Sequence, residues 1–407
     1  MRILFIDKFY PPRGGVGAYT QSIVPVLRRR GHQVLQFGTV GGDRTGRFPR
    51  FNDFTRTGFL TAPLALAKMV HNTEAANSLQ RFLRHNRVDV AHLHNIYHHL
   101  TPSILPVLAR RRVGIVLRLA DYRLACPNKH FLRPDGHCMR CQANRFYHAA
   151  GQRCGGWSGL ALAIESYVHR LGRSYFKWVD FFICPTRFMR QVMLKAGVPA
   201  DKCVVLRNAV APLPVQAPGA PGQQGPRELL FAGRMSFEKA PEMMLELARR
   251  MPDVHVTLAG DGPMLEQLRS DARQQGLRNV TFAGQVGRDR LGRLVQRAAA
   301  VVITSRWLEN STMSMLEGMG AGRCVIVPDR GPLKEWVCDG QTGRLYRPDD
   351  LTSLEQVVGE VLSDAAGRKR MGEAAARLVA RRHDPQRIAE RLEILYEEAI
   401  RRCALRC

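Results

Sequence analysis

The chain has 407 residues, which is too long for one ordinary hydrophobic core and typical of a protein with two domains. Its 45% hydrophobic and 24% charged residues are typical of a folded globular protein, and no apolar run is long enough to cross a bilayer as a helix. The formal net charge of +26 indicates an anionic partner, such as acidic lipid, a phosphorylated substrate or nucleic acid.

The positive charge is concentrated in the first half of the chain. Residues 1–210 carry 32 Lys and Arg against 10 Asp and Glu, whereas the remaining residues carry 29 against 25. We therefore expect the first half to bind the partner that this charge attracts. A basic proteome or a solvated surface is the other interpretation.

The N-terminal sequence predicts a cytoplasmic protein, which can also lie on the inner face of the cytoplasmic membrane. The apolar run in Met1–Asp7 is stopped by a charge and is too short for a signal peptide. Most of the ten cysteines should then stay reduced. Among them, Cys184, Cys203 and Cys324 lie in strand-like runs, as small buried hydrophobes do.

Apolar strand-like runs alternate with helical patterns along both halves of the chain, which predicts an α/β fold with parallel sheets covered on both faces. In the first half the predicted strands are Arg2–Asp7, Gln33–Gly38, Val88–His94, Gly114–Leu119, Phe181–Pro185 and Val204–Leu206. In the second half they are Glu228–Ala232, Val254–Ala259, Val280–Ala283, Ala300–Thr304, Cys324–Val327 and Gly343–Tyr346. The predicted helices include Ala18–Arg30, Pro241–Arg250, Pro263–Gln275, Ser314–Met319 and Pro385–Arg402.

A stretch rich in Pro, Gly and Gln divides the two halves. Residues 211–227 lack apolar periodicity and are interpreted as a linker between a Rossmann-like domain over 1–210 and a second one over 228–383. The helix in 384–407 either continues the second domain or crosses back onto the first. Ligands of open parallel sheets bind beyond the carboxyl ends of the strands, so two such domains facing each other predict a central cleft.

Four cysteines, Cys126, Cys138, Cys141 and Cys154, lie in a basic, loop-like insertion over 126–154. Their C-x11-C-x2-C-x12-C spacing contains a single C-x-x-C pair. A long loop with few hydrophobic residues needs a source of order, so one interpretation is a structural zinc ion held by the four thiolates. Reduced thiols and disulfides are the alternatives.

The stretch Leu160–Trp178 follows this insertion and mixes aromatic with basic residues in a helical pattern. Such a helix can rest on a membrane surface. An ordinary packed helix is the alternative.

Two motifs of the second half suit an anionic, polyhydroxylated ligand. After the strand at 228–232, Gly233 allows a sharp turn, and Arg234 and Lys239 can converge on one phosphate. Further on, a polar turn leads into a helix N-terminus, where backbone N–H groups favour phosphates or sugar hydroxyls. Glu309 lies in that turn and Glu317 on the helix, and carboxylates accept strong hydrogen bonds from hydroxyls.

In order and spacing these motifs resemble those of the family 4 retaining glycosyltransferases, which have two Rossmann-like domains (the GT-B fold). That family pairs a Gly-Arg loop and a following Lys with two glutamates separated by seven residues. The chain is most similar to members with a Cys-rich insertion in the first domain. The resemblance implies transfer of a sugar from a nucleotide diphosphate sugar to an acceptor hydroxyl, with retention of the anomeric configuration.

The resemblance also implies roles for individual residues. Arg234 and Lys239 would neutralise the diphosphate leaving group, and Glu309 would hold the donor sugar, so that no catalytic metal is expected. The implied donor-binding set also contains Gly14, Gly15, Gly233, Asn310, Ser311, Thr312, Met313 and Glu317.

In the first domain, the resemblance implies an acceptor side made by His94, Asn95, Arg118 and Asp121. One departure lies there, because many relatives have a histidine where this chain has Ala120. Either the reaction does not need that imidazole, or another group replaces it, or the domain is catalytically silent.

Taken with the basic first half, the resemblance implies a hexosyltransferase of cell-surface polysaccharide or lipopolysaccharide assembly, with a lipid-linked or anionic saccharide acceptor. A catalytically silent nucleotide-sugar-binding protein is the alternative. A nucleic-acid-binding protein explains the charge but not the motifs in the near-neutral second half, so nucleic acid is not expected as a partner.

Overall fold

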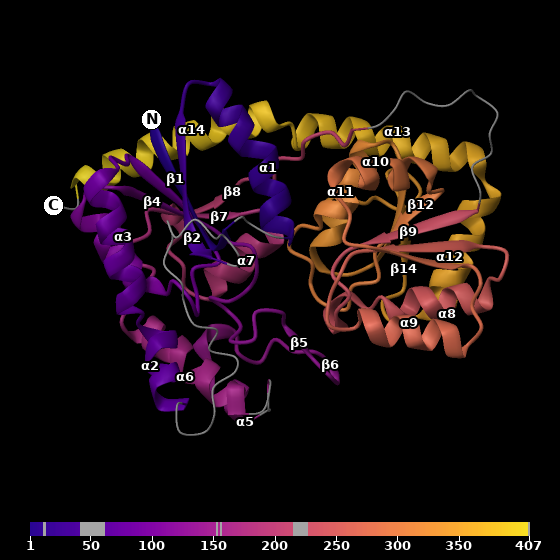
Figure 1. The fold of residues 1–407 in the computed structure, drawn as a ribbon, viewed down its shortest axis with the longest axis horizontal. Coiled ribbons are helices and arrows are strands. Elements are labelled where there is room, and N and C mark those ends of the chain that lie inside the picture. Colours follow the sequence, from indigo (N-terminus) through magenta and orange to yellow (C-terminus); the bar gives the residue numbers. More distant parts are fainter. Residues whose placement is uncertain (11–13, 41–61, 152–153, 155–156, 215–226, 406–407) are drawn as a thin grey trace. The chain divides into compact units, whose positions relative to one another are not determined.

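The computed structural model describes the chain except residues 11–13, 41–61, 152–153, 155–156, 215–226 and 406–407 (Figure 1). It divides into two compact units. Unit 1 comprises Met1–Asn208 and Pro385–Cys407, and unit 2 comprises Ala209–Asp384. Each unit is a parallel β-sheet with helices around it, so the predicted fold class of two Rossmann-like α/β domains is confirmed.

The sheet of unit 1 has the strand order β2-β1-β3-β4-β7-β8, and all neighbouring strands in it are parallel. Its strands are β1 (Arg2–Tyr10), β2 (Gln33–Val40), β3 (Val90–His94), β4 (Gly114–Arg118), β7 (Phe181–Cys184) and β8 (Cys203–Val205), with a separate hairpin of β5 (Leu132–Arg133) and β6 (Gly136–His137). Its helices are α1 (Gly14–Arg29), α2 (Ala62–Val70), α3 (Thr73–His85), α4 (Leu105–Arg110), α5 (Tyr147–Gly151), α6 (Trp157–Leu171), α7 (Arg187–Lys195) and α14 (Pro385–Leu405). The central strands β3, β4 and β7 are buried along their whole length, which explains their near-continuous apolar sequences.

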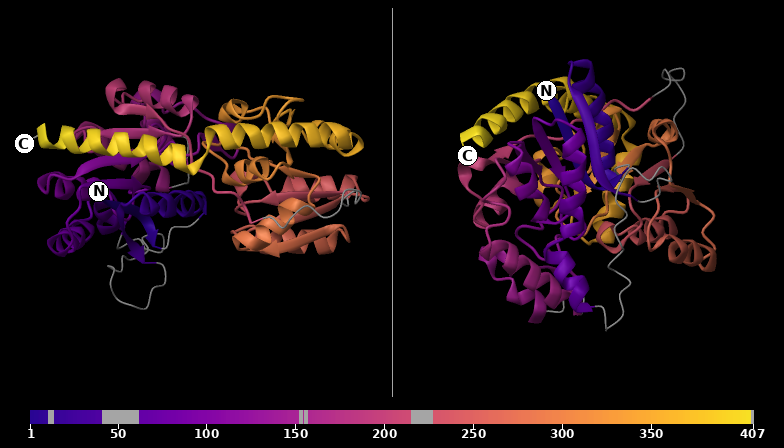
Figure 2. Two further views of the ribbon diagram at one scale, coloured as in Figure 1. Left: turned by 90° about the horizontal axis from the view of Figure 1, so that it is seen from above. Right: turned by 60° about the vertical axis from the view of Figure 1, so that its left-hand side comes forward.

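The last helix of the chain, α14, belongs to unit 1 and packs against β4 and α1 (Figures 1 and 2). Gly114 at the start of β4 permits this approach, because a Cβ there would lie 2.9 Å from the backbone of Ala399. A buried hydrogen bond of 2.6 Å joins the Tyr396 hydroxyl to Nδ1 of His92 on β3. The C-terminal helix thus completes the core of the unit in which the chain begins.

The helix predicted over Leu160–Trp178 is shorter than expected at its C-terminal end. α6 ends at Leu171, and Arg173 adopts a left-handed backbone conformation with φ of 48°. A left-handed residue cannot continue an α-helix, so the following residues form turns. Within the described residues, no helix combines the length and the apolarity that crossing a membrane requires.

Unit 2 has the strand order β11-β10-β9-β12-β13-β14, again with parallel neighbours. Its strands are β9 (Glu228–Ala232), β10 (His255–Ala259), β11 (Val280–Gly284), β12 (Ala300–Val302), β13 (Cys324–Pro328) and β14 (Arg344–Tyr346). Its helices are α8 (Glu242–Arg250), α9 (Leu265–Gln274), α10 (Arg288–Arg297), α11 (Met313–Gly320), α12 (Leu351–Ser363) and α13 (Ala365–Arg382). This order reverses direction between β9 and β12, and the carboxyl ends of strands at such a reversal are where doubly wound folds bind ligands.

The loop after β10 packs directly on the loop after β9. Gly260 has φ of 144°, and a Cβ on it would lie 1.8 Å from the carbonyl oxygen of Gly233. Two backbone hydrogen bonds, Gly233 N–H to Ala259 O at 2.9 Å and Met235 N–H to Asp261 O at 3.0 Å, join the loops. Glycine at position 260 therefore fixes the path of the backbone that carries Arg234.

We expect Gly260→Ala to destabilise unit 2 by about 2–4 kcal/mol, because it combines a positive φ with a direct clash against backbone. Urea unfolding measures the loss as a lower midpoint at unchanged slope. Gly276→Ala is the matched control, since Gly276 has φ of 62° but no atom within 4 Å of its Cβ position. Equal losses in the two variants would contradict the clash.

Candidate active site

The switch point of unit 2 brings together two residues that lie 70 positions apart. Lys239 follows β9, and Glu309 follows the adjacent strand β12. Lys239 Nζ donates a hydrogen bond to Glu309 Oε1 at 2.5 Å, and the Ser305 hydroxyl donates to the same oxygen. The structure therefore joins two of the three predicted catalytic side chains into one ion pair at the carboxyl edge of the sheet.

Glu309 is a buried carboxylate, with 2% of its surface exposed. Burial by itself raises the pKa of Glu309, but the charge and hydrogen bond of Lys239 and the hydrogen bond of Ser305 outweigh it, so that the pKa lies below its ordinary value. At neutral pH the site thus holds an ionised carboxylate with strong capacity to accept hydrogen bonds from hydroxyl groups.

Lys239 is held from two sides. It ends a short 3₁₀ turn, Phe237–Lys239, and its carbonyl oxygen accepts a hydrogen bond of 2.7 Å from the hydroxyl of Thr304, two residues after β12. Its ammonium group lies 5.3 Å from the centre of the Trp307 ring, within the range of a cation–π contact. The cation is therefore positioned by its backbone and by an aromatic face as well as by Glu309.

Glu317 lies on α11, nearly buried at 7% exposure, and forms an ion pair with Arg288 at 3.1 Å. Burial raises the pKa of Glu317, and Arg288 opposes this effect only in part. Arg288, the first residue of α10, also donates hydrogen bonds to the carbonyl oxygens of Ala211 (3.0 Å) and Pro212 (3.1 Å). No motif marks Arg288, because an arginine at the start of a helix is usually a solvated side chain.

The predicted polar turn leads into α11 as expected. Thr312 is the residue before the helix, and its side chain does not cap the first turn. Asn310 and Thr312 are buried, whereas Ser311 is half-buried. The first N–H groups of a helix have no partner within it, so this end of α11 offers donors next to Glu309 in the chain.

Arg234 follows Gly233 on the same loop as Lys239, and its side chain is exposed. It forms no ion pair with another of the described residues. The convergence of Arg234 and Lys239 on one anion therefore stays a prediction.

In unit 1, Gly14 and Gly15 form the exposed start of α1, which follows β1 after residues outside the described range. Gly14 has φ of 59°, a conformation that favours glycine. The strand order of the unit 1 sheet reverses between β1 and β3, and α1 is the helix that follows β1 in the chain.

Asn95 and Asp121 belong to one polar chain at the carboxyl edge of the unit 1 sheet. The Tyr97 hydroxyl contacts both Asn95 Oδ1, at 3.1 Å, and Asp121 Oδ2, and Asn95 Nδ2 lies 3.5 Å from Asp7 Oδ1. Burial raises the pKa of Asp7 to about 6 and also raises the pKa of Asp121. Ala120, which precedes Asp121 in the sequence, is half-buried. Sequence reasoning missed Asp7 and Tyr97, which no motif marks.

Arg118 and His94, in contrast, are buried beneath this edge. Arg118 donates a hydrogen bond to Asn208 and stacks 4.1 Å above the ring centre of Tyr19. His94 is 1% exposed and packs against His92 with ring centres 4.7 Å apart. Burial lowers the pKa of His94 well below its ordinary value, so the imidazole is neutral. Their predicted roles towards an acceptor stay predictions, and the structure shows both as parts of the core.

The four cysteines of the insertion are free thiols. Burial raises the pKa of Cys141 and the other three cysteines raise it further, so the four share one neighbourhood. Among the described residues, however, no group of three or more His, Cys, Asp and Glu side chains is arranged to hold a metal ion. The segment is ordered instead by the β5–β6 hairpin and by a small apolar cluster in which Cys141 packs with Phe146, Ala149 and Ala163. This arrangement gives the zinc site no support, and the site stays a prediction.

Two Rossmann-like domains, one of which has a Lys–Glu pair and a helix N-terminus at the switch point of its sheet, are the arrangement expected of a GT-B glycosyltransferase. Family profiles agree with this assignment. The one described as "Glycosyl transferases group 1" matches residues 220–378, and the one described as "Glycosyl transferase 4-like domain" matches residues 14–209.

Relatives match over nearly the whole chain. A glycogen synthase of Mycobacterium tuberculosis is 30% identical over 425 residues, which cover 98% of this chain and 95% of that protein. An alpha-monoglucosyldiacylglycerol synthase of Streptococcus pneumoniae is 22% identical over 85% of this chain and 75% of its own length. The chain therefore belongs to the family 4 glycosyltransferases with the GT-B fold, a family of nucleotide-sugar-dependent enzymes.

Solved structures agree in fold. Sucrose-phosphate synthase of Thermosynechococcus elongatus is similar with a TM-score of 0.71 and 15% identity, covering 98% of this chain and 99% of that one. Anabaena HepE, solved in complex with UDP-glucose, gives a TM-score of 0.67 and 16% identity over 98% of this chain and 100% of its own.

Proposed function

We propose that the protein transfers a hexose from a nucleotide diphosphate sugar to an acceptor hydroxyl with retention, in the assembly of cell-surface polysaccharide or lipopolysaccharide. The observation that carries the donor half of this proposal is the ion pair between Lys239 and the buried Glu309 at the switch point of unit 2. It combines a cation for the diphosphate with an ionised acceptor of hydrogen bonds for the sugar hydroxyls.

In this proposal the bond between the anomeric carbon and the diphosphate breaks as the acceptor oxygen bonds to that carbon on the same face, and the proton of the acceptor hydroxyl passes to the departing diphosphate oxygen. Lys239 and Arg234 stabilise the negative charge that develops on the departing diphosphate, so no divalent metal is needed for that purpose. Glu309 and the N-terminus of α11 hold the sugar, and Glu317 binds the ribose hydroxyls of the nucleotide. Arg288 keeps the carboxylate of Glu317 in place through their ion pair.

The acceptor is proposed to bind unit 1, where the positive charge of the chain is concentrated. A lipid-linked or anionic saccharide suits that charge, and the relationship to a glucosyldiacylglycerol synthase supports a lipid acceptor. The glycogen synthase relationship favours a second candidate, a soluble glucan acceptor. Both acceptors use the same donor chemistry.

The test first compares the melting temperature of the purified protein without ligand and with UDP-, GDP- or ADP-sugars. A donor at about 100 times its Kd should stabilise the fold by about 2.7 kcal/mol by mass action. The stabilising donor is then incubated with lipid-linked, anionic and glucan acceptors, and proton NMR reads the anomeric configuration of the product.

An α-linked product from an α-configured donor is the expected result. A β-linked product would contradict retention. Donor binding without turnover on any of these acceptors would instead support the silent nucleotide-sugar-binding protein that Ala120 raises as the alternative.

A further inference from the structure

Helix α6 buries a carboxylate and an imidazole but exposes large apolar side chains. Four large apolar side chains at helical spacing are exposed: Leu160 (44%), Ile164 (36%), Val168 (44%) and Leu171 (80%). The opposite side of the helix, with Glu165 and His169, is buried. A helix that covers the core of a domain in water has the reverse arrangement, so the apolar side of α6 indicates a non-aqueous neighbour.

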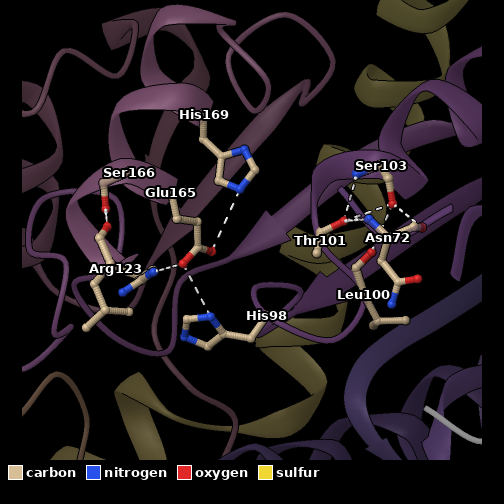
Figure 3. A network of polar contacts seen from close by, with 10 residues as sticks. Asn72, His98, Leu100, Thr101, Ser103, Arg123, Glu165, Ser166 and His169 are labelled. Carbon is tan, nitrogen blue, oxygen red and sulfur yellow. Dashed lines mark hydrogen bonds and ion pairs between the residues drawn. The ribbon is translucent and has the colours of Figure 1, made fainter. Parts of the chain in front are cut away.

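A buried ion network holds α6 to unit 1 (Figure 3). The Glu165 carboxylate, 1% exposed, forms an ion pair with Arg123 and lies 3.3 Å from His98 Nδ1 and 3.7 Å from His169 Nε2. Figure 3 shows the guanidinium of Arg123 and the two imidazoles directed at this one carboxylate. Because this network holds the polar side, the apolar side is not needed to hold the helix on the domain.

Exposed apolar surface is concentrated in this part of the molecule. Of the nine large hydrophobic side chains that are exposed among the described residues, six lie between positions 139 and 171. Besides the four on α6, they are Met139 and Tyr147. The apolar helix α2 packs beside α6, and its Leu66, Met69 and Val70 are only half-buried. Clustered exposed apolar residues mark an interaction surface rather than scattered surface hydrophobes.

The surroundings of this surface are basic. Residues 136–178 contain six Arg and Lys and a single acidic residue, Glu165, which is buried in the ion network. Arg173 and Lys177 follow α6 directly, and Arg140 and Arg145 precede it; the side chains of all four are exposed. Apolar residues on one side of a helix with cations around them are the combination that binds the interface of an anionic bilayer.

We propose that the exposed face of α6, defined by Leu160, Ile164, Val168 and Leu171, docks on a bilayer that contains anionic lipid. The four side chains enter the boundary between headgroups and acyl chains, while the flanking cations contact lipid phosphates. A second copy of this chain fits the surface less well, because a twofold interface would bring the same cations against each other. The inference rests on the proposed function, because a protein docked on a bilayer can reach a lipid-linked acceptor. The donor chemistry does not depend on it.

The experiment measures sedimentation of the full chain with phosphatidylcholine vesicles and with vesicles that also contain one quarter phosphatidylglycerol. The test variant is Ile164→Ser/Val168→Ser/Leu171→Ser, and the matched control is Ile394→Ser on α14, where the side chain is 64% exposed. We expect binding to the anionic vesicles that falls about 100-fold or more in the triple variant and changes less than about twofold in the control. Arg173→Glu/Lys177→Glu should lower binding about tenfold or more, and only to the anionic vesicles.

Three results would overturn the proposal: no vesicle binding by the unmodified chain, equal binding by the triple variant, or a concentration-dependent dimer that the triple variant abolishes. Stabilisation by donor and transfer to a soluble acceptor are measured on the same samples. If vesicle binding fails while donor stabilisation persists, the docking surface is wrong and the donor chemistry stands. If donor stabilisation fails while vesicle binding persists, the donor chemistry is wrong and the docking surface stands.

Discussion

Replacing Glu309 by Gln should lower turnover by about 10²–10³-fold while leaving unit 2 folded. The amide has the shape of the carboxylate, so the packing around this buried position is retained. It carries no charge, however, and it accepts weaker hydrogen bonds from sugar hydroxyls. Lys239, the partner of Glu309, has a partly exposed side chain, and its ammonium group can reach water when the ion pair is lost, which limits the cost in stability.

The measurement is a comparison of steady-state kcat and unfolding midpoint for Glu309→Gln and for a control, Glu266→Gln on α9, whose side chain is exposed. The control should keep turnover within about twofold. Turnover of Glu309→Gln within about threefold of the unmodified protein would remove Glu309 from the chemistry. A loss of turnover accompanied by an equal loss of folded protein would show a structural role alone.

Replacing Glu165 by Leu should cost unit 1 about 3–5 kcal/mol of folding free energy, because Arg123 is left as a buried charge without a partner. The double variant Arg123→Leu/Glu165→Leu should recover a large part of this loss, since it removes both charges. Urea unfolding of the two variants measures the difference. A double variant as unstable as the single one would show that shape, and not charge, holds α6.

The same carboxylate makes a prediction about pH. Burial alone raises the pKa of Glu165, but Arg123 and the two histidines lower it well below its ordinary value of 4.5. A folded-state pKa below the unfolded-state value means that the stabilisation is complete above about pH 4.5 and is lost as the pH falls below it. The unmodified protein should therefore lose more stability between pH 6 and pH 3.5 than the double variant does.

The sheets could be predicted well from the sequence because their strands are buried on both faces. All twelve predicted strands are present in the two parallel sheets, with ends shifted by at most a few residues, as for β1, which continues to Tyr10. The prediction extends α6 too far, because the pattern of Leu160–Trp178 stays helical beyond Leu171. Gly172 directly follows the last helical residue and Arg173 has a left-handed backbone, so this glycine is the local signal for the end of the helix.

The candidate site was predictable where topology alone brings residues together. Lys239 and Glu309 each follow a strand, and adjacent strands at a switch point place their following residues side by side. Arg288 was not predictable, since its contact with Glu317 depends on how α10 lies against α11. The inward direction of Glu165 was equally hidden, because helical spacing fixes which residues share a side but not which side faces the core.

The path of the chain through its two units has a practical consequence. Unit 2 is one uninterrupted stretch, Ala209–Asp384, while unit 1 is assembled from the two stretches that flank it. Unit 2, the proposed donor half, is thus an insertion within unit 1. Exchanging residues 209–384 for the equivalent stretch of a relative would transplant the donor half in one piece, whereas a single cut between the units would separate α14 from the strand it covers.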